Sequence, residues 1–221
     1  DSAKESAGDS IKLTAEYAEN NNYNVEVVDG TLTIAASSDN AVAVTGRTVE
    51  YDGKNYGLEK AEALRSGSTL YYSTDGTSYS TEEPVFTEAG TYTVYVKAEN
   101  KNYEETKAVS GTVIINKRPI TITASSAGKT YDGTALTNAE AGLTSGSLAP
   151  GQILSAITVT GSQTEVGNSE NIPDKAVITA NGKDVTSNYE ITYINGILSI
   201  TASGSNGDNT PGGGSDSGSG G

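Results

Sequence analysis

Four residue types are missing from this sequence, which contains no cysteine, histidine, methionine or tryptophan. Their absence excludes disulfides, thiolate nucleophiles, zinc–thiolate sites and imidazole acid–base catalysis. Apolar residues are also scarce, since Leu, Ile, Val and Phe together number 40 of 221, near the share at which disorder becomes the default expectation. The 13 Tyr and 28 Thr nevertheless favour a folded β-protein, because aromatic and β-branched residues suit a pleated, half-buried surface.

The formal net charge is −14, and the acidic residues are spread along the chain. The negative electrostatic potential of such a chain repels nucleic acid and anionic membrane surfaces, so we expect neither as a partner. No apolar run approaches the roughly 18 residues of a membrane span, and no segment has the pattern of a signal peptide. We therefore expect no direct insertion into a membrane.

Two short markers recur and divide the chain into repeats. Tyr-Asp-Gly occurs twice, 80 residues apart, and Asn-Tyr stands at three places shortly before a segment rich in Ile, Val or Leu. The first marker comprises Tyr51, Asp52 and Gly53, then Tyr131, Asp132 and Gly133; the tyrosines of the second are Tyr23, Tyr103 and Tyr189. Each Tyr-Asp-Gly opens a unit and each Asn-Tyr closes one.

These markers predict four segments. Residues 1–36 are the C-terminal strands of a truncated repeat, 37–116 form β module A, 117–202 form β module B, and 203–221 form a Gly/Ser-rich flexible linker with 8 Gly and 5 Ser. The period of 80 to 86 residues is typical of small independent domains, because solenoid repeats run to only about 20–45 residues.

Alternating apolar and polar residues predict strands over 91–96 and 120–123. Turns with a positive-φ glycine are predicted at Asp29-Gly30, Asp52-Gly53, Asp75-Gly76, Asp132-Gly133 and Asn195-Gly196. Two segments are compatible with a helix: 57–65, where Leu58, Ala61 and Leu64 have helical spacing, and 3–18, where extended structure is the alternative. The whole pattern predicts an all-β protein.

The motifs of module B support a family resemblance. Residues 127–136, which contain Tyr-Asp-Gly, together with 181–189 and 195–200, resemble the YDG/MBG-type repeat modules found in tandem in bacterial surface proteins and adhesins. Module A is similar to a sister type. The resemblance implies mostly-β, β-grasp-like modules, with an immunoglobulin-like β-sandwich as the nearest alternative. It also implies a bacterial cell-surface location, with neighbouring repeats of the parent chain as partners.

We interpret the recurrent markers as structural. Tyr51 and Tyr131 are expected to anchor each core, while the following Asp bonds its own turn and the Gly supplies the unusual dihedral angle. The three Asn-Tyr pairs are interpreted as turn-to-strand markers.

No residue is predicted to be catalytic, cofactor-binding or metal-binding. Glu82-Glu83 and Glu104-Glu105 are adjacent pairs, which point to opposite faces of a strand and cannot flank one bond, so a carboxylate-based hydrolase is the weakest alternative. Residues 181–188 contain a single carboxylate, too few for a typical calcium loop. Calcium binding and a Lys–Asn isopeptide bond both stay open.

The function that we expect is a non-catalytic stalk or spacer of an extracellular bacterial surface protein. The short junction at 116–119, with Pro119, favours a semi-rigid link between modules. The alternatives are a module that binds a glycan or a host protein, or an adhesive role by β-strand addition. The tyrosines that could form a glycan platform are Tyr71, Tyr72, Tyr79, Tyr92 and Tyr95.

Overall fold

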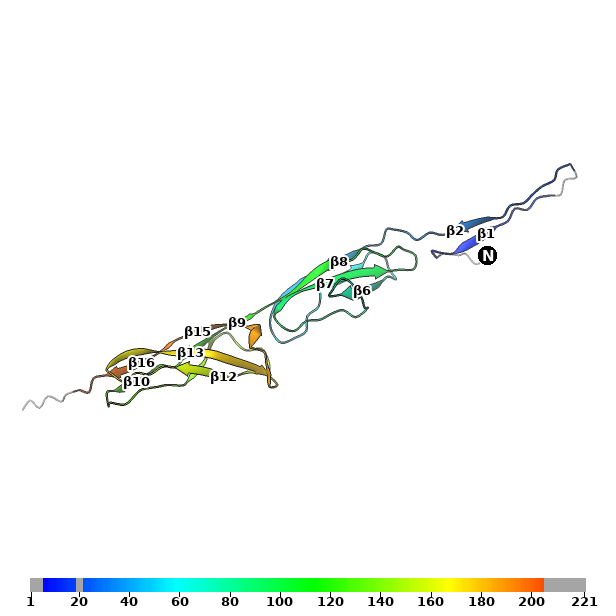
Figure 1. Ribbon diagram of the computed structural model, residues 1–221. Helices are drawn as coiled ribbons and strands as arrows, with labels where there is room; N and C mark the ends of the chain where they lie inside the picture. Colours follow the sequence, from blue (N-terminus) through cyan, green and yellow to red (C-terminus); the bar gives the residue numbers. More distant parts are fainter. Residues whose placement is uncertain (1–5, 19–21, 205–221) are drawn as a thin grey trace, which may run out of the picture. The chain divides into compact units, whose positions relative to one another are not determined.

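The computed structural model describes residues 6–18 and 22–204 (Figure 1), so most of the predicted linker, 205–221, lies outside the described residues. The described chain is all-β, which confirms the predicted fold class, and its helical structure is limited to the 3₁₀ turn η1 (Thr186–Asn188). No helix in this described part is long and apolar enough to cross a membrane.

The chain forms two compact units, and neither of them is one continuous segment of the sequence. Unit 1 contains residues 1–118 together with Leu148–Gln152 and Val185–Glu190, whereas unit 2 contains 119–147, 153–184 and 191–221. Two segments that belong by sequence to module B therefore pack within unit 1.

Unit 1 is built on a four-stranded sheet with the order β4-β8-β7-β6, of which Figure 1 labels β6, β7 and β8. Its strands are β4 (Arg47–Glu50), β6 (Thr69–Ser73), β7 (Gly90–Glu99) and β8 (Val109–Asn116). Two antiparallel pairs accompany it, β1 (Ser10–Leu13) with β2 (Gly30–Thr33) and β3 (Val42–Thr45) with β5 (Lys60–Ala63).

Unit 2 is built on a sheet with the order β10-β16-β13-β12, to which β14 adds by pairing with β13, and on a second sheet with the order β11-β9-β15. The first sheet contains β10 (Ala127–Thr130), β12 (Gln152–Thr160), β13 (Gly167–Ala180), β14 (Lys183–Asp184) and β16 (Gly196–Thr201); the second contains β9 (Arg118–Ala124), β11 (Ala141–Ser145) and β15 (Tyr189–Ile194). The first residues of β12 and β15 belong to unit 1.

The two sheets share one topological feature. In unit 1 the short strand β4 pairs parallel with β8, and in unit 2 the short strand β10 pairs parallel with β16. On its other side, β8 pairs antiparallel with β7, and β16 pairs antiparallel with β13. The repeat seen in the sequence is thus also a repeat of sheet topology.

Each unit has a small core of β-branched and aromatic residues. In unit 1 the buried residues are Tyr51, Leu58, Val94, Val96, Ala98, Val113 and Ile115, with Ala149, Val185 and Tyr189 from the two later segments. In unit 2 they are Ile120, Ile122, Ala124, Ala176, Ile178, Leu198 and Ile200. The predicted strands at 91–96 and 120–123 lie within β7 and β9 and supply part of these cores.

Both helical alternatives are wrong for the residues described. Residues 60–63 form β5, which pairs with β3 and alternates between exposed and half-buried side chains. Leu58 is buried whereas Leu64 is exposed, so the helical spacing of these residues does not correspond to one apolar face. Residues 10–13 form β1, and the other described residues of 3–18 contain no helix. Pairing between strands overrides the local helical pattern.

At Asn195-Gly196 the glycine is needed because there is no room for a Cβ atom, and its φ is not positive. Gly196 begins β16, and a Cβ atom added there would lie 2.6 Å from the carbonyl oxygens of Ala124 and Ser125. Gly30 likewise begins a strand, β2, whereas Gly53, Gly76 and Gly133 do have positive φ. The turn prediction is therefore correct at three of the five dipeptides.

This close approach gives a test of packing in unit 2. We expect Gly196→Ala to destabilise the protein by about 1–3 kcal/mol, because the backbone carbonyls of Ala124 and Ser125 must move to admit the methyl group. Gly142→Ala, also in a strand of unit 2 but with nothing within 4 Å of its Cβ, is the matched control. Urea unfolding measures both, and equal stability of the two variants would contradict the packing.

Candidate functional site

The two Tyr-Asp-Gly markers occupy the same position in the two units. Tyr51 directly follows β4 and its N–H donates to the carbonyl oxygen of Asn116, the last residue of β8, at 2.9 Å. Tyr131 directly follows β10 and its N–H donates to the carbonyl oxygen of Thr201, the last residue of β16, at 2.8 Å. The marker therefore ends the parallel pair that closes each sheet.

The Asp and Gly of each marker form the predicted turn. Asp52 Oδ1 accepts the N–H of Lys54 at 3.0 Å, and the φ of Gly53 is +79°. Asp132 Oδ1 accepts the N–H of Thr134 at 2.9 Å, and the φ of Gly133 is +77°. An Asp that bonds the backbone two residues ahead, followed by a left-handed glycine, stabilises a tight turn.

Hydrogen bonds favour the ionised form of both Asp side chains. The Lys129 ammonium and then the N–H and hydroxyl of Thr134 donate to Asp132, which holds its pKa well below the ordinary value. At Asp52 burial opposes ionisation, but hydrogen bonds from Lys54 and Tyr56 outweigh it, so its pKa is also lowered. The turns are thus built around carboxylates and not around protonated acids.

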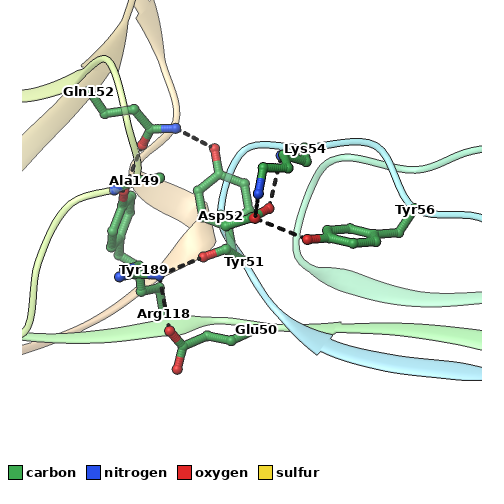
Figure 2. A network of polar contacts seen from close by, with 9 residues as sticks. All are labelled: Glu50, Tyr51, Asp52, Lys54, Tyr56, Arg118, Ala149, Gln152 and Tyr189. Atoms are coloured by element: carbon green, nitrogen blue, oxygen red, sulfur yellow. Dashed lines mark hydrogen bonds and ion pairs between the residues drawn. The ribbon is translucent and has the colours of Figure 1, made fainter.

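Tyr51 is the centre of a buried hydrogen-bond network (Figure 2). Gln152 Nε2 donates to the Tyr51 hydroxyl at 2.8 Å, and Gln152 Oε1 accepts from the Tyr189 hydroxyl at 2.6 Å. The Tyr189 hydroxyl in turn accepts the N–H of Ala149 at 2.9 Å. The rings of Tyr51 and Tyr189 meet edge to face, with centroids 5.7 Å apart. Burial raises the pKa of Tyr189, so this hydroxyl keeps its proton and remains a donor.

An ion pair flanks this network. The Arg118 guanidinium donates to Glu50 Oε1 at 3.1 Å and to the carbonyl oxygen of Tyr51 at 3.3 Å (Figure 2). Glu50 is the last residue of β4, and Arg118 begins β9. The backbone on both sides of the Tyr51 side chain is therefore held by hydrogen bonds.

Tyr131 differs from Tyr51 in its surroundings. The side chain of Tyr51 is 2% exposed, whereas that of Tyr131 is 39% exposed. The expectation that both tyrosines anchor a core is therefore correct for Tyr51 and wrong for Tyr131. The groups that cover Tyr51 come from the distant segments Leu148–Gln152 and Val185–Glu190 and not from module A.

The Asn of two Asn-Tyr markers reaches back to a distant Ala-Gly turn. Asn188 Oδ1 accepts the N–H of Ala89 at 2.7 Å, and Asn188 Nδ2 donates to Glu88. In the same way, Asn102 Oδ1 accepts the N–H of Ala7 at 3.2 Å. These contacts span 99 and 95 residues, so each marker binds the repeat before its own.

The tyrosines of the three Asn-Tyr markers lie in different environments. Tyr189 is buried against Tyr51, Tyr103 is half-buried beneath the Arg65 guanidinium at 5.7 Å, and Tyr23 is 74% exposed. The sequence predicts these markers at the start of the closing segments, but it does not identify the groups that their Asn side chains bind. A pattern that points to these groups is present in Ala7-Gly8, Ala89-Gly90 and Val166-Gly167, each at or just before a strand that pairs with a closing strand.

The five tyrosines considered for a glycan platform do not form one stack. Tyr71 and Tyr79 lie over the Lys97 ammonium, at 5.8 and 4.9 Å from it to the ring centroids. The ring of Tyr92 stacks on Phe86, with centroids 4.0 Å apart and planes 7° from parallel. These rings are used in contacts within unit 1.

Acidic side chains do not gather into a metal site in the described part of the chain, where no group of three or more Asp and Glu is placed to hold an ion. Glu105 of the Glu104-Glu105 pair forms an ion pair with Lys97. The site that the repeat markers build is therefore a packing and hydrogen-bonding site.

Comparisons with known proteins identify no family. No protein-family model matches the chain, and no curated protein matches it. Among solved structures, N-cadherin EC1-3 of Drosophila is similar at a TM-score of 0.24 and 14% sequence identity, over 72% of this chain. The chain spans 65% of the length of that cadherin structure.

The two equivalent tyrosines provide a matched test of the network. We expect Tyr51→Phe to lower the free energy of unfolding by about 1–2 kcal/mol, because the half-buried Gln152 amide loses its acceptor. Tyr131→Phe, at the same position of the other unit, should change it by less than about 0.5 kcal/mol. Urea unfolding followed by circular dichroism measures both. Similar losses in the two variants would contradict the network.

Acid titration tests the turn at Asp132. Because the folded pKa is below the unfolded value, the turn stabilises the protein above the unfolded pKa, and this contribution is lost as the pH falls through the folded pKa. We expect Asp132→Asn to lose less stability than the parent chain between roughly pH 5 and pH 2. Urea midpoints measured across this range provide the comparison, and parallel curves would contradict it.

Proposed function

We propose that the chain is a non-catalytic stalk or spacer of an extracellular bacterial surface protein. The observation that carries the proposal is the parallel pairing of β4 with β8 and of β10 with β16. In each unit a strand near the start of the repeat lies beside the strand that ends it. Tension along the chain pulls these two neighbours in opposite directions along their length, so their hydrogen bonds resist together and not one at a time.

The chemistry of the chain supports a passive role. It contains no thiol, imidazole, thioether or indole, and the hydroxyls of its buried Tyr51 and Tyr189 bond to the Gln152 amide and, for Tyr189, to the Ala149 N–H. The resemblance of residues 37–202 to YDG/MBG-type modules supports a location on a bacterial surface. The net charge of −14 favours solubility and opposes binding to nucleic acid.

One surface feature favours the alternative of glycan binding. A shallow depression of about 520 Å³ in unit 1 is lined by Tyr71, Tyr103, Asn100, Glu99 and Glu105, among others. Aromatic faces beside carboxylates and an amide suit a sugar. If the chain binds a glycan, this depression is the place at which we expect it.

Forced unfolding of the chain, held at its two ends, tests the spacer. The N–H groups of a strand alternate in direction, and that of Tyr51 donates to β8, so that of Val49 points to β8 and that of Thr48 points away. We expect Val49→Pro to lower the unfolding force of unit 1, because it removes one bond of the loaded pair.

The controls are Thr48→Pro, whose lost N–H faces away from β8 at the sheet edge, and Val49→Ala, which removes the side chain alone. Both should keep an unfolding force closer to that of the parent chain. Equal forces in Val49→Pro and Thr48→Pro would show that the parallel pair does not carry the load.

A further inference from the structure

Strand β12 lies at an edge of the larger sheet of unit 2. In the order β10-β16-β13-β12 it pairs with β13 on one side, and no strand of the described residues lies on its other side. Residues 153–160 of β12 belong to unit 2, so this edge is a feature of one compact unit. An edge strand directs the N–H and C=O groups of alternate residues away from its sheet. β12 therefore presents a row of backbone donors and acceptors to a partner.

β12 lacks the features that protect the other edges of the described sheets. Its nine residues, Gln152–Thr160, contain no charged residue, proline or glycine. The other strands at sheet edges have at most six residues. Some are protected further: β4 contains Arg47 and Glu50, and the free side of β6 is covered where Tyr72 and Ser80 exchange two backbone hydrogen bonds. Short strands, charges and covering segments are the usual means by which a sheet prevents pairing with another chain.

The side chains of β12 also favour pairing with another strand. Ile153 is 62% exposed, and Leu154, Ile157 and Val159 are half-buried. Residues 141–164 contain no charged residue, although the whole chain has a net charge of −14. Strands that are rich in β-branched residues and carry no charge pair readily with other strands. This edge is therefore a place where two copies of an acidic chain can approach without bringing their carboxylates together.

We propose that β12 of one chain pairs antiparallel with β12 of a second copy, which joins their two sheets into one. The second copy supplies an edge of the same length, with the same free backbone groups and no charge of its own. When the two antiparallel strands overlap fully, Gln152 lies opposite Thr160 of the other copy, and Ala156 lies opposite its own counterpart. The proposal goes beyond the spacer function and does not require it.

The contact joins two identical surfaces, so it is isologous and closes at a dimer. Each copy uses its β12 edge once, and no further copy can add to the pair by the same contact. The net charge of −14 on each copy opposes association, so salt that screens this repulsion strengthens the dimer.

Sedimentation velocity of the intact chain over a wide concentration range, at about 0.15 and 0.5 M NaCl, tests the proposal. We expect a monomer–dimer equilibrium that strengthens with salt. Ala156→Lys, at an exposed position, should weaken it by at least about tenfold, because it places two like charges opposite each other. The matched control is Asn168→Lys, at an exposed position of β13, which has a neighbouring strand on both sides. It makes the same change in net charge and should dimerise like the parent chain.

A pair of charge variants gives the sharpest result. Ala156→Glu should also dimerise poorly, whereas an equimolar mixture of Ala156→Lys and Ala156→Glu should recover the dimer, because an ammonium and a carboxylate then face each other. Such recovery also shows that both variants are folded. In the parent chain, the backbone amides of residues 153–160 should exchange hydrogen more slowly as the concentration rises.

Three results would overturn the proposal. The first is a monomer at every concentration and salt, which would leave the edge to a strand of another protein or to none. The second is association that persists unchanged in both Ala156 variants, because it would use another surface. The third is growth beyond a dimer, which an isologous contact does not allow.

Discussion

The hydroxyl of Tyr189 accepts the N–H of Ala149 and donates to Gln152, whose amide donates to Tyr51. The buried Tyr189 hydroxyl requires such partners, because a buried polar group without a hydrogen bond destabilises the fold by more than a hydrogen-bonded one stabilises it. These bonds join β4 to segments about 100–140 residues further along the sequence, which is why Leu148–Gln152 and Val185–Glu190 pack within unit 1. Unit 1 therefore includes residues that belong by sequence to module B.

The contact between an Asn-Tyr turn and the preceding repeat explains why the markers recur. Asn102 binds the Ala7 N–H and Asn188 binds the Ala89 N–H, so an Asn-Tyr turn holds the preceding Ala-Gly turn in both cases. Asn suits this role because its carboxamide accepts from a backbone N–H and donates at the same time. Recurrence in this chain reflects a packing role at each junction between repeats.

Low apolar content and absent disulfides have a common physical consequence. Each core is thin, with a few Val, Ile and Leu side chains, and long antiparallel pairs such as β7 with β8 supply the remaining order through backbone hydrogen bonds. In this setting a satisfied tyrosine adds a large apolar ring and a specific hydrogen bond at once. The parallel pairs β4 with β8 and β10 with β16 end at the two Tyr-Asp-Gly markers.

The sequence by itself determined the all-β class, the strands at 91–96 and 120–123, and the Asp–Gly turns at 52–53 and 132–133, because strand alternation and turn chemistry are local properties. The repeat boundaries at 36, 116 and 202 and the family resemblance stay predictions. Only the tertiary structure decided that residues 60–63 form a strand, that Tyr51 is buried while Tyr131 is exposed, and that Gln152 and Ala149 complete the network. These features depend on contacts between residues far apart in the chain, and no local pattern specifies which distant segment covers a given side chain.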